Sequence, residues 1–188
     1  MRILLLVGPS GVGKTTTCLR IIALAREHDL RVAGVLSLPI YDSQVKSAIN
    51  LHEIISSRER TLARIAPSGI EADIGIWSFD PNTILWGQEL LGCLPACDLL
   101  VIDEIGPLEI QMGKGLTNAM TALHRAEYHL ALVSLRPSMI EALVKLLPGV
   151  KISVYWLDKN NRNLMPESII AGYEKDERWE MIYADRTI

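Results

Sequence analysis

The chain has 188 residues, 49% of them hydrophobic, and its 19 Lys and Arg against 22 Asp and Glu give a formal net charge of −3. This length and apolar content predict one domain, residues 1–188, with a core large enough to bury a β-sheet on both faces. Basic residues form no block, which disfavours a nucleic-acid surface or a polybasic membrane anchor and leaves a small anion as the expected partner. The apolar run 3–7 is too short for a signal peptide, so we expect a cytoplasmic protein, with a monomer as the default state.

A glycine-rich turn follows the first predicted strand and leads into a helical pattern over 15–28. The turn reads Gly8-Pro9-Ser10-Gly11-Val12-Gly13-Lys14-Thr15-Thr16. Glycines let successive backbone N–H groups turn toward phosphate oxygens, and the helix N-terminus adds a partial positive charge. We expect Lys14 to reach the β and γ phosphates of a nucleotide and Thr15 to offer its hydroxyl to Mg²⁺. The pattern and its strand-to-helix context therefore predict a phosphate-binding loop, the Walker A motif, rather than a glycine-rich turn with an incidental lysine.

The next segments predict a parallel core with an antiparallel insertion. A strand at 30–38 follows the first helix, and this strand–helix–strand order implies a parallel crossover. Between 44 and 51 the apolar positions alternate, with Val45, Ser47, Ile49 and Leu51 on one side, and a second short run covers 61–65. With a turn at 56–59, the range 41–65 predicts an antiparallel hairpin joined to the parallel strands.

The rest of the chain predicts alternating strands and helices. A short strand at 74–79 precedes a helix that Asp80 and Pro81 start and that runs to residue 91. Further segments at 98–102, 115–126, 130–133, 137–146 and 152–156 bring the expected sheet to five or more parallel strands, and the charged stretch 174–178 is expected on the surface. Cys93 and Cys97 lack a second Cys or His pair nearby, which favours free thiols over metal ligands.

The strand at 98–102 ends in two adjacent carboxylates, Asp103 and Glu104. Ligands of open α/β sheets bind at the carboxyl ends of the strands, so the run fits a Walker B strand better than a core strand closed by two surface carboxylates. Asp103 is then expected to hold Mg²⁺ together with Thr15, and Glu104 to orient or deprotonate the attacking water. Residues 103–106 also fit the Asp-x-x-Gly motif of GTPases, but the nearest match to their guanine-reading motif, at 158–161, has the wrong order. A guanine-specific switch is therefore disfavoured.

With these motifs the chain resembles the small P-loop nucleoside-triphosphatases of thermophilic microbes, a family that includes a human cancer-related NTPase. The resemblance covers residues 1–162 and rests on the phosphate loop, the Leu62-Ala63-Arg64 and Phe79-Asp80-Pro81 strings, the range 98–109 with Asp-Glu-Ile-Gly-Pro-Leu-Glu, and Asn161-Arg162. It implies a three-layer α/β P-loop NTPase fold with a RecA-like, mostly parallel sheet, and slow Mg²⁺-dependent hydrolysis of several nucleoside triphosphates. The family's hairpin region is glycine-rich, whereas residues 41–54 contain no glycine.

The sequence thus predicts a hydrolase that cleaves the β–γ bond of ATP, GTP and other nucleoside triphosphates with broad base specificity, using Lys14, Asp103 and Glu104. Two alternatives stay open: a nucleotide or nucleoside kinase, in which three arginines of the hairpin region could form a lid (Arg58, Arg60 and Arg64), and a nucleotide-dependent switch. Glu109 could be a second catalytic carboxylate or a helix cap, and Arg162 could contact base or phosphate or be solvated.

Overall fold

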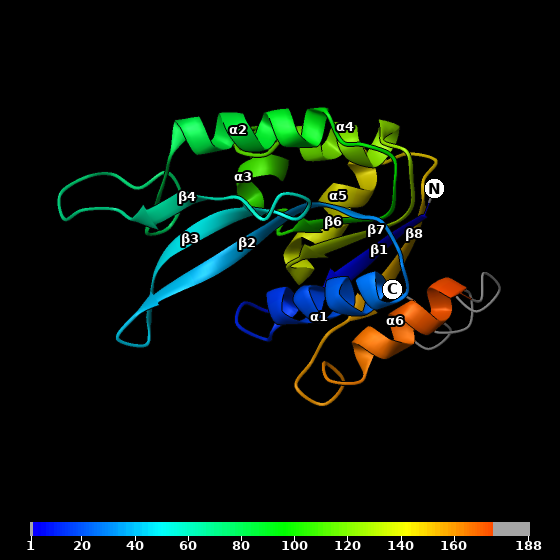
Figure 1. The fold of residues 1–188 in the computed structure, drawn as a ribbon. Helices are drawn as coiled ribbons and strands as arrows, with labels where there is room; N and C mark the ends of the chain where they lie inside the picture. Colours follow the sequence, from blue (N-terminus) through cyan, green and yellow to red (C-terminus); the bar gives the residue numbers. More distant parts are fainter. Residues whose placement is uncertain (1, 175–188) are drawn as a thin grey trace.

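An eight-stranded mixed β-sheet forms the centre of the computed structural model, which describes residues 2–174 (Figure 1). The strands are β1 (Arg2–Val7), β2 (Val32–Asp42), β3 (Val45–Glu53), β4 (Glu59–Ile65), β5 (Trp77–Phe79), β6 (Cys97–Asp103), β7 (Tyr128–Leu135) and β8 (Lys151–Trp156). Their order is β5-β4-β3-β2-β6-β7-β1-β8. Neighbours from β2 to β8 pair in parallel, and β2, β3, β4 and β5 pair in antiparallel. The predicted fold class, a mostly parallel sheet with an antiparallel part, is confirmed.

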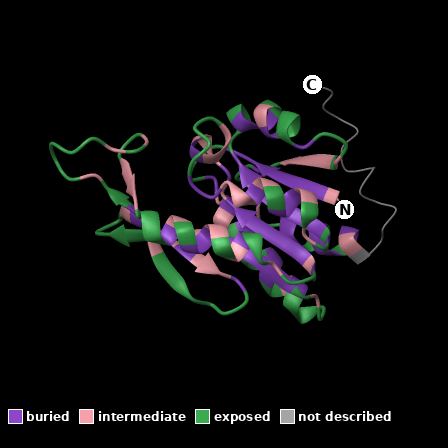
Figure 2. Ribbon diagram, turned by 90° about the horizontal axis from the view of Figure 1, so that it is seen from above, coloured by how far each residue is buried: buried purple, intermediate pink, exposed green. Residues whose placement is uncertain are grey.

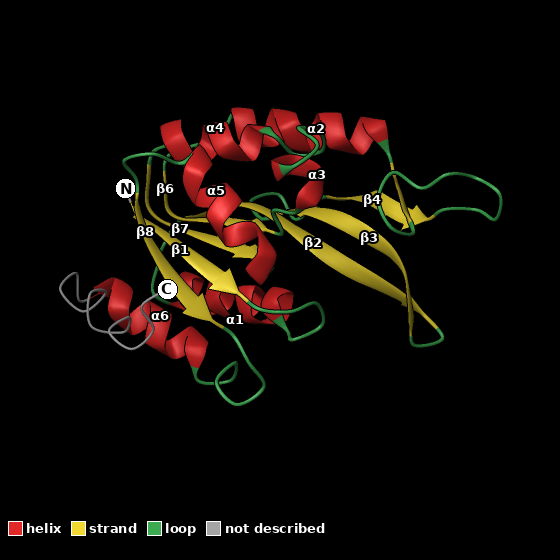
Figure 3. Cartoon of the chain, turned by 180° about the vertical axis from the view of Figure 1, so that it is seen from behind, coloured by secondary structure: helices red, strands yellow, loops and turns green. Residues whose placement is uncertain are grey.

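Helices cover both faces of the sheet and complete three layers (Figures 1 and 3). One face carries α1 (Lys14–Glu27) and α6 (Met165–Glu174), and the other carries α2 (Pro81–Gly92), α4 (Asn118–Arg125) and α5 (Ile140–Leu146). Two short elements, α3 (Pro107–Ile110) and the 3₁₀ turn η1 (Pro137–Met139), follow β6 and β7. The sequence did not predict α3 or α6, and the surface stretch expected at 174–178 lies outside the described residues beyond Glu174.

The parallel strands are aliphatic because both of their faces are covered. Leu4, Leu5 and Leu6 are each 0% exposed, and they alternate between the two hydrophobic cores that flank the sheet. The far end of the antiparallel part is more exposed than these central strands, as Figure 2 shows. Among residues 2–174 no helix is both long and apolar enough to cross a membrane.

The antiparallel part is larger than the predicted hairpin. β2 does not end near residue 38 but continues to Asp42, so the same strand pairs with β6 from Val32 to Leu36 and with β3 from Val35 to Asp42. The expected alternation in the next strand is also wrong, because the pairing of β3 with β4 shifts between Ile49 and Asn50. As a result, Ala48 and Leu51, three residues apart, are both buried.

The β2–β3 turn adopts left-handed backbone conformations without glycine. Ser43 and Gln44 have φ angles of 47° and 72° between the paired residues Asp42 and Val45. Two-residue hairpin turns of this kind need positive φ at both central positions, which glycine and asparagine adopt most readily. The absence of glycine from residues 41–54 therefore leaves the hairpin intact, with its turn built from a serine and a glutamine.

Candidate active site

The carboxyl ends of four parallel strands form one edge of the sheet. Val7 is in register with Leu135 of β7 and with Trp156 of β8. On the other side of β7, Ile102 is in register with Val133, which places Asp103 beside Ser134. The loops after β1, β6, β7 and β8 therefore leave the sheet at the same level and surround a common site.

The predicted phosphate loop, Gly8 to Thr16, joins β1 to α1 at this edge. Gly11 and Gly13 have φ angles of 77° and 111°, a left-handed backbone that side chains disfavour. Gly13 caps α1 without a side-chain hydrogen bond, and the first turn of the helix contains no acidic residue. The N-terminus of α1 is thus left for an external anion, as phosphate binding requires.

Lys14 is folded over its own loop. Its side chain is only 5% exposed, and Nζ donates hydrogen bonds to the carbonyl oxygens of Gly8 (2.8 Å) and Pro9 (3.1 Å). The same Nζ lies 3.8 Å from Oε2 of Glu104. The ammonium group therefore lies between the phosphate loop and the carboxylate that follows β6, where phosphate oxygens could replace its carbonyl partners.

Asp103 is a buried carboxylate with one unsatisfied oxygen. Its Oδ1 accepts a hydrogen bond from the Ser134 hydroxyl, whereas Oδ2 has no hydrogen-bond partner among the described residues. Burial raises the pKa of Asp103, and the nearby hydroxyls of Ser134 and Thr15 partly oppose that rise. A carboxylate oxygen without a partner beside a threonine hydroxyl is a hard oxygen donor set that fits Mg²⁺.

Glu104 is 27% exposed and lies between two cations. Oε1 is 3.1 Å from Nε of Arg136, whereas Lys14 lies nearer the other oxygen, Oε2. A third cation, Lys46 of β3, lies close enough to Glu104 for their charges to interact. Burial lowers the pKa of Lys46, and the Glu104 carboxylate opposes that change. Arg136 and Lys46 were not predicted as site residues, and no short motif in the sequence marks either of them.

A protein-family model described as NTPase matches residues 3–170. The chain belongs to this NTPase family. Relatives include the nucleoside-triphosphatase THEP1 of Caldivirga maquilingensis, 31% identical over 105 residues that make up 55% of this chain and 58% of that protein. THEP1 of Thermofilum pendens is 24% identical over 166 residues, which are 88% of this chain and 91% of that protein.

Two solved structures share the fold of this NTPase-family chain. The solution structure of a human cancer-related nucleoside triphosphatase is similar with a TM-score of 0.70 at 19% identity, over 94% of this chain and all of that one. The crystal structure of THEP1 from Aquifex aeolicus is similar with a TM-score of 0.58 at 16% identity, over 93% of this chain and 99% of that one. The family resemblance predicted from the motifs is confirmed.

Glu109 caps backbone amides in this member of the NTPase family. Its Oε2 accepts a hydrogen bond from the Gly106 amide at 3.0 Å, and Oε1 accepts one from the Leu116 amide at 3.1 Å. Burial raises the pKa of Glu109, and these amide hydrogen bonds oppose the rise. With both oxygens bound to the backbone, the capping role fits better than a catalytic one. The Gly106 amide, which would sense a γ phosphate in a GTPase, is bound to the same carboxylate.

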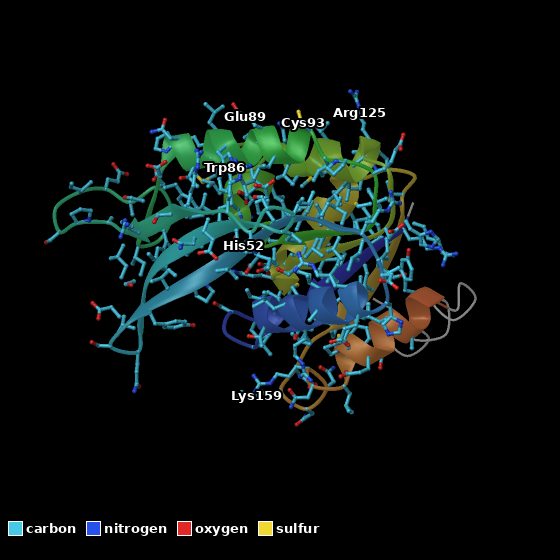
Figure 4. All side chains as sticks on the ribbon, in the orientation of Figure 1. His52, Trp86, Glu89, Cys93, Arg125 and Lys159 are labelled. Carbon is cyan, nitrogen blue, oxygen red and sulfur yellow. The ribbon has the colours of Figure 1, made fainter. Side chains whose placement is uncertain are left out.

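The three arginines considered as a kinase lid are bound elsewhere. Arg58 forms an ion pair with Glu53 (2.8 Å), and the guanidinium carbons of Arg58 and Arg60 lie 5.8 and 4.7 Å from the centre of the Trp86 ring. Trp86 belongs to α2, on the opposite face of the sheet from α1 (Figure 4). Arg64 donates a hydrogen bond to the Thr61 hydroxyl at 3.3 Å.

The cysteines are free thiols. Cys18 and Cys97 are buried and Cys93 is exposed. Burial raises the pKa of both buried thiols. Within residues 2–174 no three or more His, Cys, Asp and Glu side chains gather as a metal site.

Proposed function

We propose that the chain is a Mg²⁺-dependent nucleoside-triphosphatase that cleaves the β–γ bond of ATP, GTP and other nucleoside triphosphates. The observation that carries this proposal is the 3.8 Å separation of Lys14 Nζ and Glu104 Oε2. A cation suited to the γ phosphate and a carboxylate suited to activating water are thereby adjacent at the phosphate loop. Membership of the NTPase family and the names of its relatives support the same activity.

Each residue has a separate task in the proposed reaction. The amides of the phosphate loop bind the phosphate oxygens, and Lys14 leaves the Gly8 and Pro9 carbonyls to contact the β and γ phosphates. Thr15 and Asp103 would hold Mg²⁺, which neutralises charge on the phosphates when bound. Glu104 takes a proton from a water molecule while the oxygen of that water attacks the γ phosphorus in line with the bond that breaks. The bond from that phosphorus to the bridging oxygen breaks, and the products are nucleoside diphosphate and phosphate.

Arg136 is proposed to position Glu104. It holds Oε1, so that Oε2 faces Lys14 and the phosphate loop. The phosphate loop and the two carboxylates contact only phosphates and metal in this mechanism, which supports broad base specificity. A cytoplasmic location and a monomeric state stay predictions.

The γ phosphate of labelled ATP tests the proposal against a kinase. We expect the wild-type chain with Mg²⁺ to release labelled inorganic phosphate without any acceptor, and GTP to be cleaved as well. Lys14→Ala should lose nearly all activity, because Lys14 contributes to both ground-state and transition-state binding. Label that moves mainly to an added nucleoside or nucleoside monophosphate, with little release in its absence, would contradict hydrolysis and favour the kinase.

A partner-stimulated switch makes a different prediction in the same assay. Release of phosphate by the isolated chain would then be slow and would increase when a partner protein is added.

A further inference from the structure

The sheet order determines on which side of the phosphate loop a nucleoside would lie. β1 lies between β7 and β8, and β6 lies beyond β7. Asp103 ends β6, Glu104 follows it and Arg136 follows β7, so the γ phosphate is expected on that side of the loop. A triphosphate is an extended chain, and its nucleoside therefore leaves the loop on the opposite side, next to β8.

The loop that follows β8 lies directly against the phosphate loop on this side. The Leu157 amide donates a hydrogen bond to the Val7 carbonyl at 2.7 Å, which continues the pairing of β8 with β1. A β-carbon built on Gly8 would lie 2.9 Å from the Leu157 carbonyl oxygen. The two loops are thus too close for a side chain between them.

Arg162 bridges these two loops. Its Nη1 donates a hydrogen bond to the Val12 carbonyl at 3.1 Å, and the side chain is half-buried. A β-carbon built on Gly13 would lie 3.5 Å from both Cδ and Nη1 of Arg162, which is van der Waals distance. The guanidinium therefore packs against Val12 and Gly13 of the phosphate loop, directly before Lys14.

The backbone that carries Arg162 is held by its own hydrogen bonds. Oδ1 of Asp158 accepts from the amides of Asn160 (2.7 Å) and Asn161 (2.9 Å). The Asn161 side chain in turn accepts from the Asp158 amide at 2.9 Å and donates to the Trp156 carbonyl at 2.7 Å. These hydrogen bonds fix the conformation of the loop that carries Arg162.

We propose that Arg162 binds the nucleoside half of the substrate, with the planar face of its guanidinium against the base. This inference rests on the proposed function and assigns a second subsite to it. Stacking of a planar cation on a base needs no particular hydrogen-bond pattern, because every base has a π face. Such a contact strengthens nucleotide binding without selecting the base, which accounts for broad specificity in a chain without a guanine-reading motif.

Equilibrium binding separates the nucleoside subsite from the phosphate subsite without requiring turnover. Calorimetry would measure the dissociation constants of ADP, GDP and inorganic pyrophosphate, each with Mg²⁺, for the wild type and Arg162→Ala. The ratio of the pyrophosphate constant to the ADP constant reports what the nucleoside adds. Lys159→Ala is the matched control, since it removes an exposed cation from the same loop (Figure 4).

We expect Arg162→Ala to weaken ADP and GDP binding alike by about tenfold, a typical effect of removing one stacking contact, while pyrophosphate binding changes less than about twofold. Lys159→Ala should leave all three constants near wild type. Arg162→Lys, which keeps the charge but lacks the planar face, should retain pyrophosphate binding and lose most of the nucleoside contribution.

Three results would overturn the inference. Equal weakening of ADP and pyrophosphate in Arg162→Ala and Arg162→Lys would show that Arg162 acts on phosphate or on the loop alone. A wild-type chain that binds ADP no better than pyrophosphate would have no nucleoside subsite. A wild-type chain that binds none of the three ligands would contradict the proposed function itself, together with the inference that rests on it.

Discussion

Asp103 carries a carboxylate that is 1% exposed and has one oxygen without a hydrogen bond among the described residues. Because burial raises the pKa of Asp103, its carboxylate binds a proton more readily in the folded chain than in the unfolded chain. The stabilising effect of that proton is fully present below the unfolded value of about 3.9. This stabilising effect is lost as the pH rises through the pKa of Asp103 in the folded chain. At neutral pH the charged Asp103 carboxylate therefore lowers the free energy of unfolding.

Asp103→Asn should therefore stabilise the nucleotide-free chain at neutral pH, because burying an amide costs less free energy than burying a charged carboxylate. We expect a gain of about 0.5–2 kcal/mol, or roughly 2–6 °C in Tm for a chain of this size. The gain should disappear below about pH 4, where wild-type Asp103 is protonated in both states. Thermal unfolding at pH 7 and at low pH measures both effects. A lower Tm at pH 7 would contradict this description of the site.

Arg136→Gln tests the positioning of Glu104. The pair with Glu104 is short, but the Arg136 side chain is 51% exposed, so its contribution is discounted to about 1 kcal/mol. We expect kcat to fall by about fivefold to tenfold, with ADP affinity unchanged and partial recovery in Arg136→Lys. Arg125→Gln, at the end of α4, is the control and should keep wild-type kcat. Loss of ADP affinity in step with kcat would indicate a structural role instead.

At the scale of elements, Gly34 fixes how closely β2 approaches β6. Its φ angle is 117°, and a β-carbon on this residue would lie 1.9 Å from the Val101 carbonyl oxygen. Gly34→Ala must therefore separate two central strands, and we expect a loss of more than about 3 kcal/mol. Gly149→Ala introduces strain at positive φ with nothing within 4 Å, so it should cost only about 1–2 kcal/mol. Chemical denaturation of both variants gives the difference, and similar losses would contradict the clash.

The elements predicted from sequence are those with local causes. α2 starts where expected because the Asp80 side chain accepts a hydrogen bond from the Thr83 amide at 2.7 Å, an interaction within four residues. β2 extended further than predicted because Pro39, typical of a strand end, lies beyond the last residue paired with β6 and needs no amide on that side. α6 was missed because its apolar residues, such as Ile169 and Ile170, become a helix face through packing against α1.

At the scale of the whole molecule, the strand order decides which residues meet. Lys14, Asp103 and Glu104 could be predicted because each belongs to a short motif with its own chemistry. Arg136 and Lys46 could not be placed, and for Arg162 a nucleotide contact and a solvated position both stayed open. The proximity of all three to the phosphate loop depends on β7 and β8 flanking β1 and on β3 joining the sheet through β2. No short-range pattern in the sequence predicts this order of the strands.

The central claim is that Glu104 activates the water while the phosphate loop and Asp103 hold the nucleotide and Mg²⁺. Single-turnover hydrolysis of ATP by Glu104→Gln, with nucleotide affinity measured on the same sample, tests it most directly. Glutamine keeps the size of the side chain but cannot accept the proton, so hydrolysis should slow by about 10²–10⁴-fold while affinity stays within a few fold. Turnover near the wild-type rate in Glu104→Gln would contradict the claim.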